Sequence, residues 1–220
     1  MNHLELPGHK CVLGMTGSGK SYAVKAEIRA HKGGVLVLDP KNEGDWPCYY
    51  LSGAEDLRDM YGALKRGAHL AYVPDRDREK AGRLVEKVCN DLLDSTWGDL
   101  WLVVDEADIY AGKQVPSPLE WIAQRGRSQG VKGVWITQRP AGLNHILLTQ
   151  ADHHLMFWLG VFEWPYFEKY KVSGEDVQRR LGAKVNHRYL LWDQSALTGP
   201  FRKGEAVLDT SKAGRGIQDV

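Results

Sequence analysis

The stretch Gly14-Met15-Thr16-Gly17-Ser18-Gly19-Lys20-Ser21 fits the phosphate-binding pattern G-x-x-x-x-G-K-[ST], the P-loop. The apolar run Cys11–Leu13 precedes it, and the helix-compatible run 21–28 follows it. In a strand-loop-helix unit of this kind, the glycine-rich turn directs consecutive backbone N–H groups toward bound phosphates. A glycine-rich turn that binds nothing is the alternative, but it would not require these flanks. The stretch therefore predicts a nucleoside triphosphate site, with ATP and Mg²⁺ as its ligands.

Each part of this stretch has an expected role. Lys20 should reach the β- and γ-phosphates, and the Ser21 hydroxyl should bind Mg²⁺. The loop backbone and the first helical residues should surround the phosphates. The expected nucleotide-binding set is Gly14, Met15, Thr16, Gly17, Ser18, Gly19, Lys20, Ser21 and Tyr22.

A second motif follows the apolar run Leu100–Val104, which lacks alternation and is therefore typical of a strand buried on both faces of a parallel sheet. Asp105 and Glu106 come directly after it, which is the Walker B arrangement. Asp105 is expected to hold Mg²⁺ through its water shell, and Glu106 to activate the attacking water as general base. The alternative is that both acids cap a following helix, because helix starts favour Asp and Glu.

The chain has 220 residues and 43% hydrophobic content, which suits one α/β core. We expect a single P-loop ATPase domain over residues 1–208 and a mobile, glycine-rich tail over 209–220. Apolar runs alternate with helical patterns, so the domain should contain a mostly parallel sheet flanked by helices. Further strands are expected at 35–38, 48–51, 69–73 and 133–137, and further helices at 54–64, 79–93 and 119–128.

The location of the protein is also constrained. The longest apolar run, Leu155–Phe162, is much shorter than the roughly 20 residues that span a bilayer, so we interpret it as a buried strand. Residues 1–10 show no secretory signal pattern. Cys11, Cys48 and Cys89 are far apart and odd in number, which favours reduced thiols. These features predict a protein with no transmembrane segment that is not secreted.

Charge gives a weak indication of partners. The formal net charge is only +1, so composition alone does not indicate nucleic-acid binding. Arg179, Arg180 and Lys184, with Lys113 on a loop, form a modest positive group. A ring of subunits would repeat such a group around its axis and produce a positive channel. Scattered surface charge is the alternative.

Gln138 directly follows the expected buried strand 133–137. At the end of such a strand, its amide would lie near the phosphates and could bind the γ-phosphate or the attacking water as a sensor. The helix before that strand ends with Arg125 and Arg127 among glycines. The alternative for both guanidinium groups is a favourable interaction with the helix dipole alone. The functional interpretation is an arginine finger that enters a neighbouring subunit's site.

Together with the P-loop, four further segments occur in an order that resembles the HerA/FtsK clade of P-loop ATPases. They are Asp39-Pro40-Lys41, Asp105-Glu106-Ala107, Gly126-Arg127-Ser128-Gln129-Gly130 and Ile136-Thr137-Gln138-Arg139-Pro140. The short chain is similar in length to the genome-packaging ATPases of tailless icosahedral viruses with an internal membrane.

This resemblance implies a RecA-like, additional-strand (ASCE) sheet and a hexameric ring that moves double-stranded DNA through its pore. It implies that Gln138 is the sensor and that Arg127 is the trans finger, with Arg125 as the second candidate. It also implies contact with capsid vertex proteins and a location in the host cytoplasm or the virion.

Two other functions remain open from sequence. One is a P-loop kinase of a nucleotide or metabolite, with Arg76 and Arg78 as lid residues. The other is a filamentous-phage-type assembly ATPase, although such proteins usually carry a membrane segment. The Asp-Glu pair favours hydrolysis, because a kinase uses the hydroxyl of its substrate as nucleophile.

Overall fold

The computed structural model describes residue 3 and residues 6–51, 57–75, 77–111, 118–168 and 172–201. Lys113, Arg76 and the tail 209–220, for which sequence analysis made predictions, lie outside the described residues.

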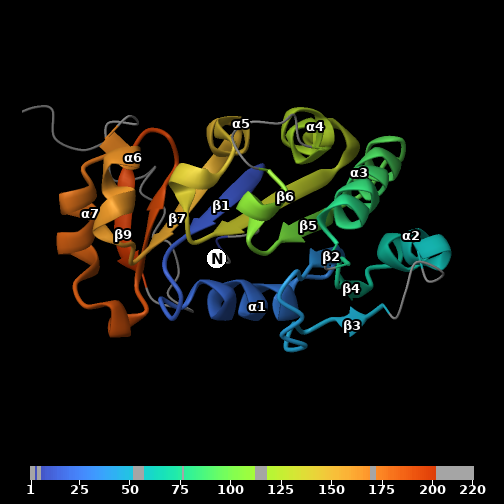
Figure 1. Ribbon diagram of the computed structural model, residues 1–220, viewed down its shortest axis with the longest axis horizontal. Coiled ribbons are helices and arrows are strands. Elements are labelled where there is room, and N and C mark those ends of the chain that lie inside the picture. The colour runs from blue at the N-terminus through green and yellow to red at the C-terminus, as the bar shows by residue number, and fades with distance from the viewer. Residues whose placement is uncertain are drawn as a thin grey trace, which may run out of the picture.

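A nine-stranded sheet forms the centre of the described structure (Figure 1). The first seven strands along the sheet are parallel, whereas the last two run antiparallel to their neighbours. The strand order is β3 (Tyr49–Tyr50), β4 (His69–Tyr72), β2 (Gly34–Leu38), β5 (Leu100–Val104), β6 (Val131–Thr137), β1 (His9–Leu13), β7 (Ala151–Phe157), β8 (Tyr189–Trp192) and β9 (Leu197–Phe201).

Strand β6 lies between β1, which leads into the P-loop, and β5, which ends in Asp105. This inserted strand is the additional strand of the predicted RecA-like core, so the predicted fold class is confirmed. Because β1, β6, β5 and β2 are parallel neighbours, their carboxyl ends meet at one edge of the sheet. The P-loop, Gln138 and Asp105 are therefore brought together by topology.

Helices cover both faces of the sheet (Figure 1). On one face, α1 (Lys20–Ala30) buries Ala23, Val24 and Ile28 against the strands. A larger hydrophobic cluster on the other face takes side chains from the remaining helices. These are α2 (Leu57–Lys65), α3 (Arg78–Leu93), α4 (Pro118–Arg125), α5 (His145–Thr149), α6 (Trp164–Glu168) and α7 (Gly174–Leu181).

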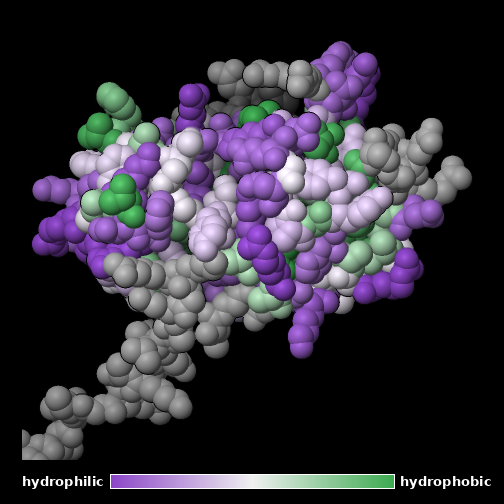
Figure 2. Space-filling model, turned by 90° about the horizontal axis from the view of Figure 1, so that it is seen from below, coloured by the Kyte–Doolittle hydropathy of each residue, from purple (hydrophilic) through white to green (hydrophobic). Residues whose placement is uncertain are grey.

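Seen from the side of α1, the described surface is mostly hydrophilic, and its hydrophobic side chains form small separate groups (Figure 2). This agrees with a helix that presents one narrow apolar stripe to the sheet and its polar positions to water. Among the helices in the described residues, none combines the length and the apolar character needed to cross a bilayer.

The predicted strand at Leu155–Phe162 is wrong in its second half. β7 ends at Phe157, and Phe162 lies in the 3-10 turn η5 (Val161–Glu163) with 91% of its surface exposed. The neighbouring strand explains the difference: β1 ends at Leu13, which pairs with Met156. Beyond this pair, β1 offers no further residues for the segment to pair with. Apolar character alone therefore does not extend β7.

The predicted helix at 119–128 also ends early. α4 stops at Arg125, and the 3-10 helix η3 (Gly126–Gln129) follows, closed by Gly130 at a φ of 77°. Glycine suits this left-handed position, which terminates the helix.

Candidate nucleotide site

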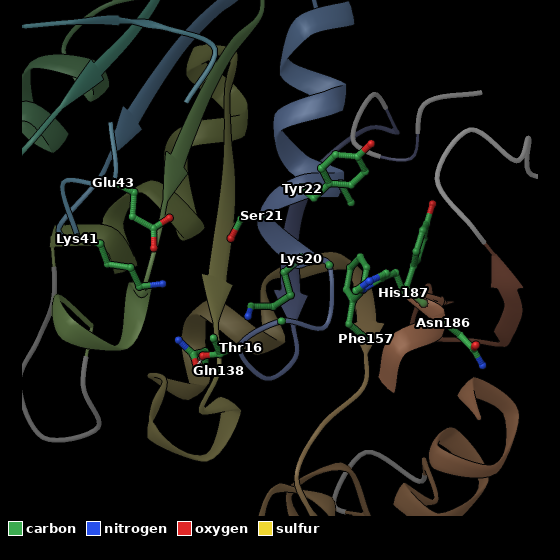
Figure 3. Close-up of a pocket in the computed structure, with 14 residues that line it drawn as sticks. Thr16, Lys20, Ser21, Tyr22, Lys41, Glu43, Gln138, Phe157, Asn186 and His187 are labelled. Atoms are coloured by element: carbon green, nitrogen blue, oxygen red, sulfur yellow. Dashed lines mark hydrogen bonds between the residues drawn. The ribbon is translucent and has the colours of Figure 1, made fainter. Parts of the chain in front are cut away.

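The P-loop borders a cavity of about 800 Å³ at the carboxyl edge of the sheet (Figure 3). Five parts of the chain line it: the P-loop with the start of α1, the segment after β2, the end of β6, the end of β7, and the segment that leads into β8. The lining residues are Thr16, Gly17, Gly19, Lys20, Ser21, Tyr22, Ala23, Lys41, Glu43, Gln138, Phe157, Asn186, His187 and Tyr189.

Two glycines of the loop are required by its shape. A Cβ atom on Gly14 would lie 2.6 Å from Phe157 Cβ and 2.7 Å from Ser18 Oγ. Gly19 has a φ of 100°, a left-handed conformation that side chains disfavour, and it begins α1 as the N-cap residue. The sequence pattern therefore reflects close approach at one end of the loop and backbone conformation at the other.

The loop presents backbone donors to the cavity. The first two amides are used internally, since Gly14 N–H donates to Thr137 O and Met15 N–H donates to Trp158 O. Within the part of the chain that the structure describes, no backbone acceptor is found for the N–H groups of Gly17, Lys20 or Ser21. Free N–H groups at a helix start attract anions through hydrogen bonding and the helix dipole.

Lys20 is buried, with only 6% of its surface exposed, and its Nζ donates to Met15 O at 3.2 Å. Burial lowers the pKa of Lys20 to about 8, although the nearby charges of Glu106 and Asp105 act in the opposite direction. A buried ammonium group that donates to a carbonyl of its own loop is further stabilised by an anionic partner such as phosphate. Lys20 lines the cavity beside the P-loop, and its contact with phosphate stays a prediction.

The Walker B acids follow β5. Asp105 is 1% exposed, and its Oδ1 accepts a hydrogen bond from Glu106 N–H at 3.1 Å. Burial raises the pKa of Asp105, and the charge of Lys41 opposes this shift. Glu106 has a φ of 46° and precedes the 3-10 helix η2 (Ala107–Ile109), but its side chain makes no capping hydrogen bond. The helix-capping alternative is thus not supported for Glu106.

Gln138 links the P-loop to the Walker B segment. Thr16 Oγ1 donates to Gln138 Oε1, and Gln138 Nε2 donates to Glu106 Oε1. Side chains from the ends of β1, β6 and β5 are thus joined in one chain of hydrogen bonds. The structure brings together all the sequence-predicted residues of the P-loop, Walker B and sensor positions.

Lys41 is a site residue to which sequence analysis assigned no role. Its Nζ lies 2.5 Å from Glu106 Oε1 and 3.4 Å from Asp105 Oδ2. Burial alone would lower the pKa of Lys41, but the hydrogen bond to Glu106 and the charge of Asp105 raise it above its ordinary value. The signal for Lys41 was the Asp39-Pro40-Lys41 turn after a buried strand, whose carboxyl end meets that of β5 in the sheet.

The opposite wall of the cavity was also missed. Asn186, His187 and Tyr189 line it, and a Cβ on Gly17 would lie 3.6 Å from Lys184 Nζ. In Figure 3, His187 and Tyr22 flank the side of the cavity that faces away from Lys41. Lys184, which sequence analysis grouped with DNA-binding candidates, thus lies beside the P-loop.

The residues present fit a magnesium ion. Ser21 offers a hydroxyl at the first turn of α1, and Asp105 offers a buried carboxylate near the ammonium of Lys41, which shows that this position favours positive charge. Hard oxygen ligands of this kind, completed by phosphate and water, are those that Mg²⁺ prefers. Ser21 and Asp105 would hold the ion.

Arg125 and Arg127 lie away from this cavity. Arg127 donates to Asp152 Oδ1 at 2.8 Å, and Asp152 Oδ2 accepts from His9 N–H at 2.9 Å. His9 and Asp152 belong to the first residues of the parallel strands β1 and β7. Both arginines therefore lie at or near the amino edge of the sheet, opposite the P-loop edge, and neither lines the nucleotide cavity of its own chain.

Two other positive groups are held by local contacts. Arg179 forms an ion pair with Asp176, and Arg180 donates to Leu197 O at 3.0 Å and to Gly199 O at 2.8 Å. Arg180 thus connects α7 to β9 and is used within the fold.

Comparisons with known proteins agree with this architecture. Residues 6–51 match the family model described as "Helicase HerA, central domain". The genome-packaging NTPase B204 of Sulfolobus turreted icosahedral virus 2, solved with AMPPCP, superposes with a TM-score of 0.63 at 20% identity, covering 88% of this chain and 98% of that one. The same protein with ATP-gammaS gives a TM-score of 0.64 at 23% identity, covering 89% and 98%.

The chain has the fold of this P-loop ATPase. VirB4 of Thermoanaerobacter pseudethanolicus shares it, with a TM-score of 0.62 at 13% identity over 86% of this chain and 87% of that one. A search of curated proteins found no match. The resemblance drawn from the motifs is therefore supported by a family model over the P-loop region and by fold similarity over most of the chain.

Proposed function

We propose that this chain is an ATPase that hydrolyses ATP to move double-stranded DNA, as a motor of viral genome packaging. The observation that carries the proposal is the hydrogen-bonded chain from Thr16 through Gln138 to Glu106 beside the P-loop. It joins a phosphate-binding loop to a carboxylate that has the position of a general base.

The proposed chemistry assigns one task to each side chain. Lys20 and the free N–H groups of the loop bind the phosphates, while Ser21 and Asp105 would hold Mg²⁺, which would supply neutralisation of the phosphate charge. Glu106 accepts a proton from the attacking water, and the amide of Gln138 orients Glu106. Both groups are held in place before substrate arrives, which lowers the cost of reaching the reactive geometry.

Hydrolysis is favoured over phosphoryl transfer to a metabolite by the buried position of Glu106, whose side chain is 12% exposed. A kinase needs an open path for a second substrate and has less need of a base beside the metal carboxylate. Of the two lid candidates for a kinase, Arg76 lies outside the described residues, and the side chain of Arg78 does too.

DNA as the moved substrate and a ring as the assembly are supported by likeness of fold. B204 of Sulfolobus turreted icosahedral virus 2 is named a genome-packaging NTPase, and B204 of Sulfolobus turreted icosahedral virus is named a DNA-packaging ATPase. The position of Arg127 at the amino edge suits a finger that acts on a neighbouring subunit, because it lies opposite its own P-loop. A homo-hexamer that works with capsid vertex proteins, in the host cytoplasm or the virion, is part of this proposal.

Phosphate release tests the proposal. The purified full chain, assayed with ATP and Mg²⁺, should release phosphate faster when double-stranded DNA is added. Parallel reactions with nucleoside monophosphates should yield no phosphorylated acceptor. Transfer of phosphate to an acceptor, with no effect of DNA, would instead favour the kinase alternative.

A further inference from the structure

We propose that Lys41 keeps divalent metal out of the Asp105-Glu106 pair until a nucleotide arrives, so that metal and nucleotide binding depend on each other through this one side chain. The exclusion of metal rests on contacts alone. The link between metal and nucleotide binding also rests on the proposed function. Lys41 Nζ contacts both acids, at 3.4 Å from Asp105 Oδ2 and 2.5 Å from Glu106 Oε1.

The two acids would otherwise be an attractive cation site. Their side chains are 1% and 12% exposed, and two adjacent buried carboxylates strongly favour a positive neighbour. Lys20, the other lysine of the cavity, donates to Met15 O within the P-loop. Among the described residues, Lys41 is the lysine or arginine that forms an ion pair with these acids, so it provides the charge that a metal ion would provide.

Hydrogen bonds hold the backbone on both sides of Lys41, whereas its side chain is partly exposed. Asp39 is fully buried and accepts hydrogen bonds from Asn42 N–H at 3.1 Å and from the Tyr50 hydroxyl at 3.0 Å. Asp39 N–H donates to Tyr72 O at 2.9 Å, which fixes the start of the turn to β4. In contrast, the Lys41 side chain is 33% exposed and extends into the cavity from the loop after β2 (Figure 3).

A triphosphate changes the balance at this side chain. Its terminal phosphate offers the ammonium a second anionic partner in the same cavity, because Lys41 and the P-loop residues line one space. When Lys41 turns toward phosphate, both acids lose their contact with its ammonium group, and Asp105 becomes free to hold the metal. Linkage then requires that metal strengthens nucleotide binding by the same factor that nucleotide strengthens metal binding.

The exclusion of metal is tested by titrating the full chain with Mn²⁺ in the absence of nucleotide. Electron paramagnetic resonance measures the free ion. Lys41→Met should bind Mn²⁺ about 5- to 150-fold more tightly than the unaltered chain. Lys41→Arg, which keeps the charge, should stay near the unaltered affinity. Lys87→Met is the matched control, because it removes one positive charge from a surface pair with Asp91 on α3.

A double variant locates the ion. Lys41→Met combined with Asp105→Asn should lose the gained Mn²⁺ affinity, whereas a gain that persists would place the ion elsewhere and overturn the proposal. Circular dichroism at each step identifies variants that fail to fold, and Lys41→Gln then replaces Lys41→Met. Equal Mn²⁺ affinity in folded Lys41→Met and the unaltered chain would also overturn it.

The link between metal and nucleotide binding is tested by binding a non-hydrolysable ATP analogue with and without Mg²⁺. The factor by which Mg²⁺ strengthens binding should fall in Lys41→Met relative to Lys87→Met. If Mg²⁺ strengthened binding of the analogue by the same factor in Lys41→Met and Lys87→Met, the proposed link through Lys41 would be refuted. Because neither measurement involves hydrolysis or DNA, failure of the proposed function would show instead as missing phosphate release in the unaltered chain.

Discussion

Thr16 in the P-loop and Gln138 at the end of β6 are joined by a direct side-chain hydrogen bond. The same amide of Gln138 donates to Glu106, so one side chain contacts both the phosphate-binding loop and the carboxylate at the end of β5. We therefore expect a shift of the loop on nucleotide binding to reach Glu106 through Gln138.

Gln138→Ala should bind ATP with near-unaltered affinity but hydrolyse it more slowly, by a factor on the order of 10². The physical reason is that Glu106 loses its orienting donor, while Lys20 and the backbone N–H groups still hold the phosphates. Stopped-flow phosphate release and equilibrium binding of a fluorescent ATP analogue give the two quantities. A parallel loss of affinity and turnover would show that Gln138 acts in ground-state binding.

Lys20→Ala and Glu106→Gln should separate binding from chemistry. Lys20→Ala removes the ammonium that is buried beside the loop and should abolish triphosphate binding. Glu106→Gln should bind ATP and turn over more slowly by about 10² to 10⁴, as expected for loss of a general base. Near-unaltered phosphate release by Glu106→Gln would mean that another group activates water.

Arg127→Ala should retain ATP binding and lose hydrolysis by roughly 10³ or more if the guanidinium acts on a neighbour. Mixed with Lys20→Ala subunits, it should recover part of the activity, because some junctions then join an intact loop to an intact arginine. Recovery is read from phosphate release at varied mixing ratios, after co-assembly is shown by light scattering. Arg125→Ala, carried through the same mixing series, decides between the two arginines.

Double-stranded DNA should bind the assembled protein without sequence preference and with an affinity that falls steeply as salt rises, since counterions are released on binding. Lys113→Ala should reduce the slope of log K against log salt by about 0.9 if that side chain contacts phosphate. Lys184→Ala should leave the slope unchanged and weaken nucleotide binding, because Lys184 lies beside Gly17. Fluorescence anisotropy with labelled duplexes measures both slopes.

Stability should fall in mild acid. Burial lowers the pKa of His9 and of His154 to about 4, below the ordinary value of 6.5. Between these values the unfolded chain binds more protons than the folded one, so the free energy of unfolding decreases as pH falls from about 6.5 to 4. Each histidine contributes up to about 1.4 kcal/mol per pH unit in that window.

Urea denaturation at several pH values from 7 to 4 measures this slope. His154→Gln removes one of the titrating groups and should flatten the curve, even where it lowers stability at pH 7. A slope unaffected by the substitution would mean that His154 keeps its ordinary pKa in the folded chain.

Sequence patterns predicted most strands of the parallel core and the P-loop side of the cavity. Buried parallel strands are continuous apolar runs, and the P-loop and the Asp105-Glu106 pair are local patterns that need no knowledge of distant contacts. Lys41 was missed as a site residue because its role depends on β2 lying next to β5, a pairing across about 60 residues that no local pattern encodes.

The C-terminal strands were missed for a different reason. β9 contains Gly199 and Pro200, which are typical of turns, and a strand at the edge of a sheet tolerates them because one side needs no partner. β8 runs antiparallel to β7, so it breaks the repeating strand-helix order from which the rest of the sheet was predicted. Because these strands were not predicted, the cavity wall formed by Asn186 and His187 was not predicted either.

Two facing walls of the cavity come from opposite ends of the described chain, the P-loop on one side and His187 on the other. All nucleoside triphosphates share the phosphates that the first side is shaped to bind, whereas they differ in base and sugar. The match to the HerA family model covers residues 6–51 and so includes only the first side. If the base of a bound nucleotide lies against His187, the choice among nucleotides depends on a part of the chain that the family model does not cover.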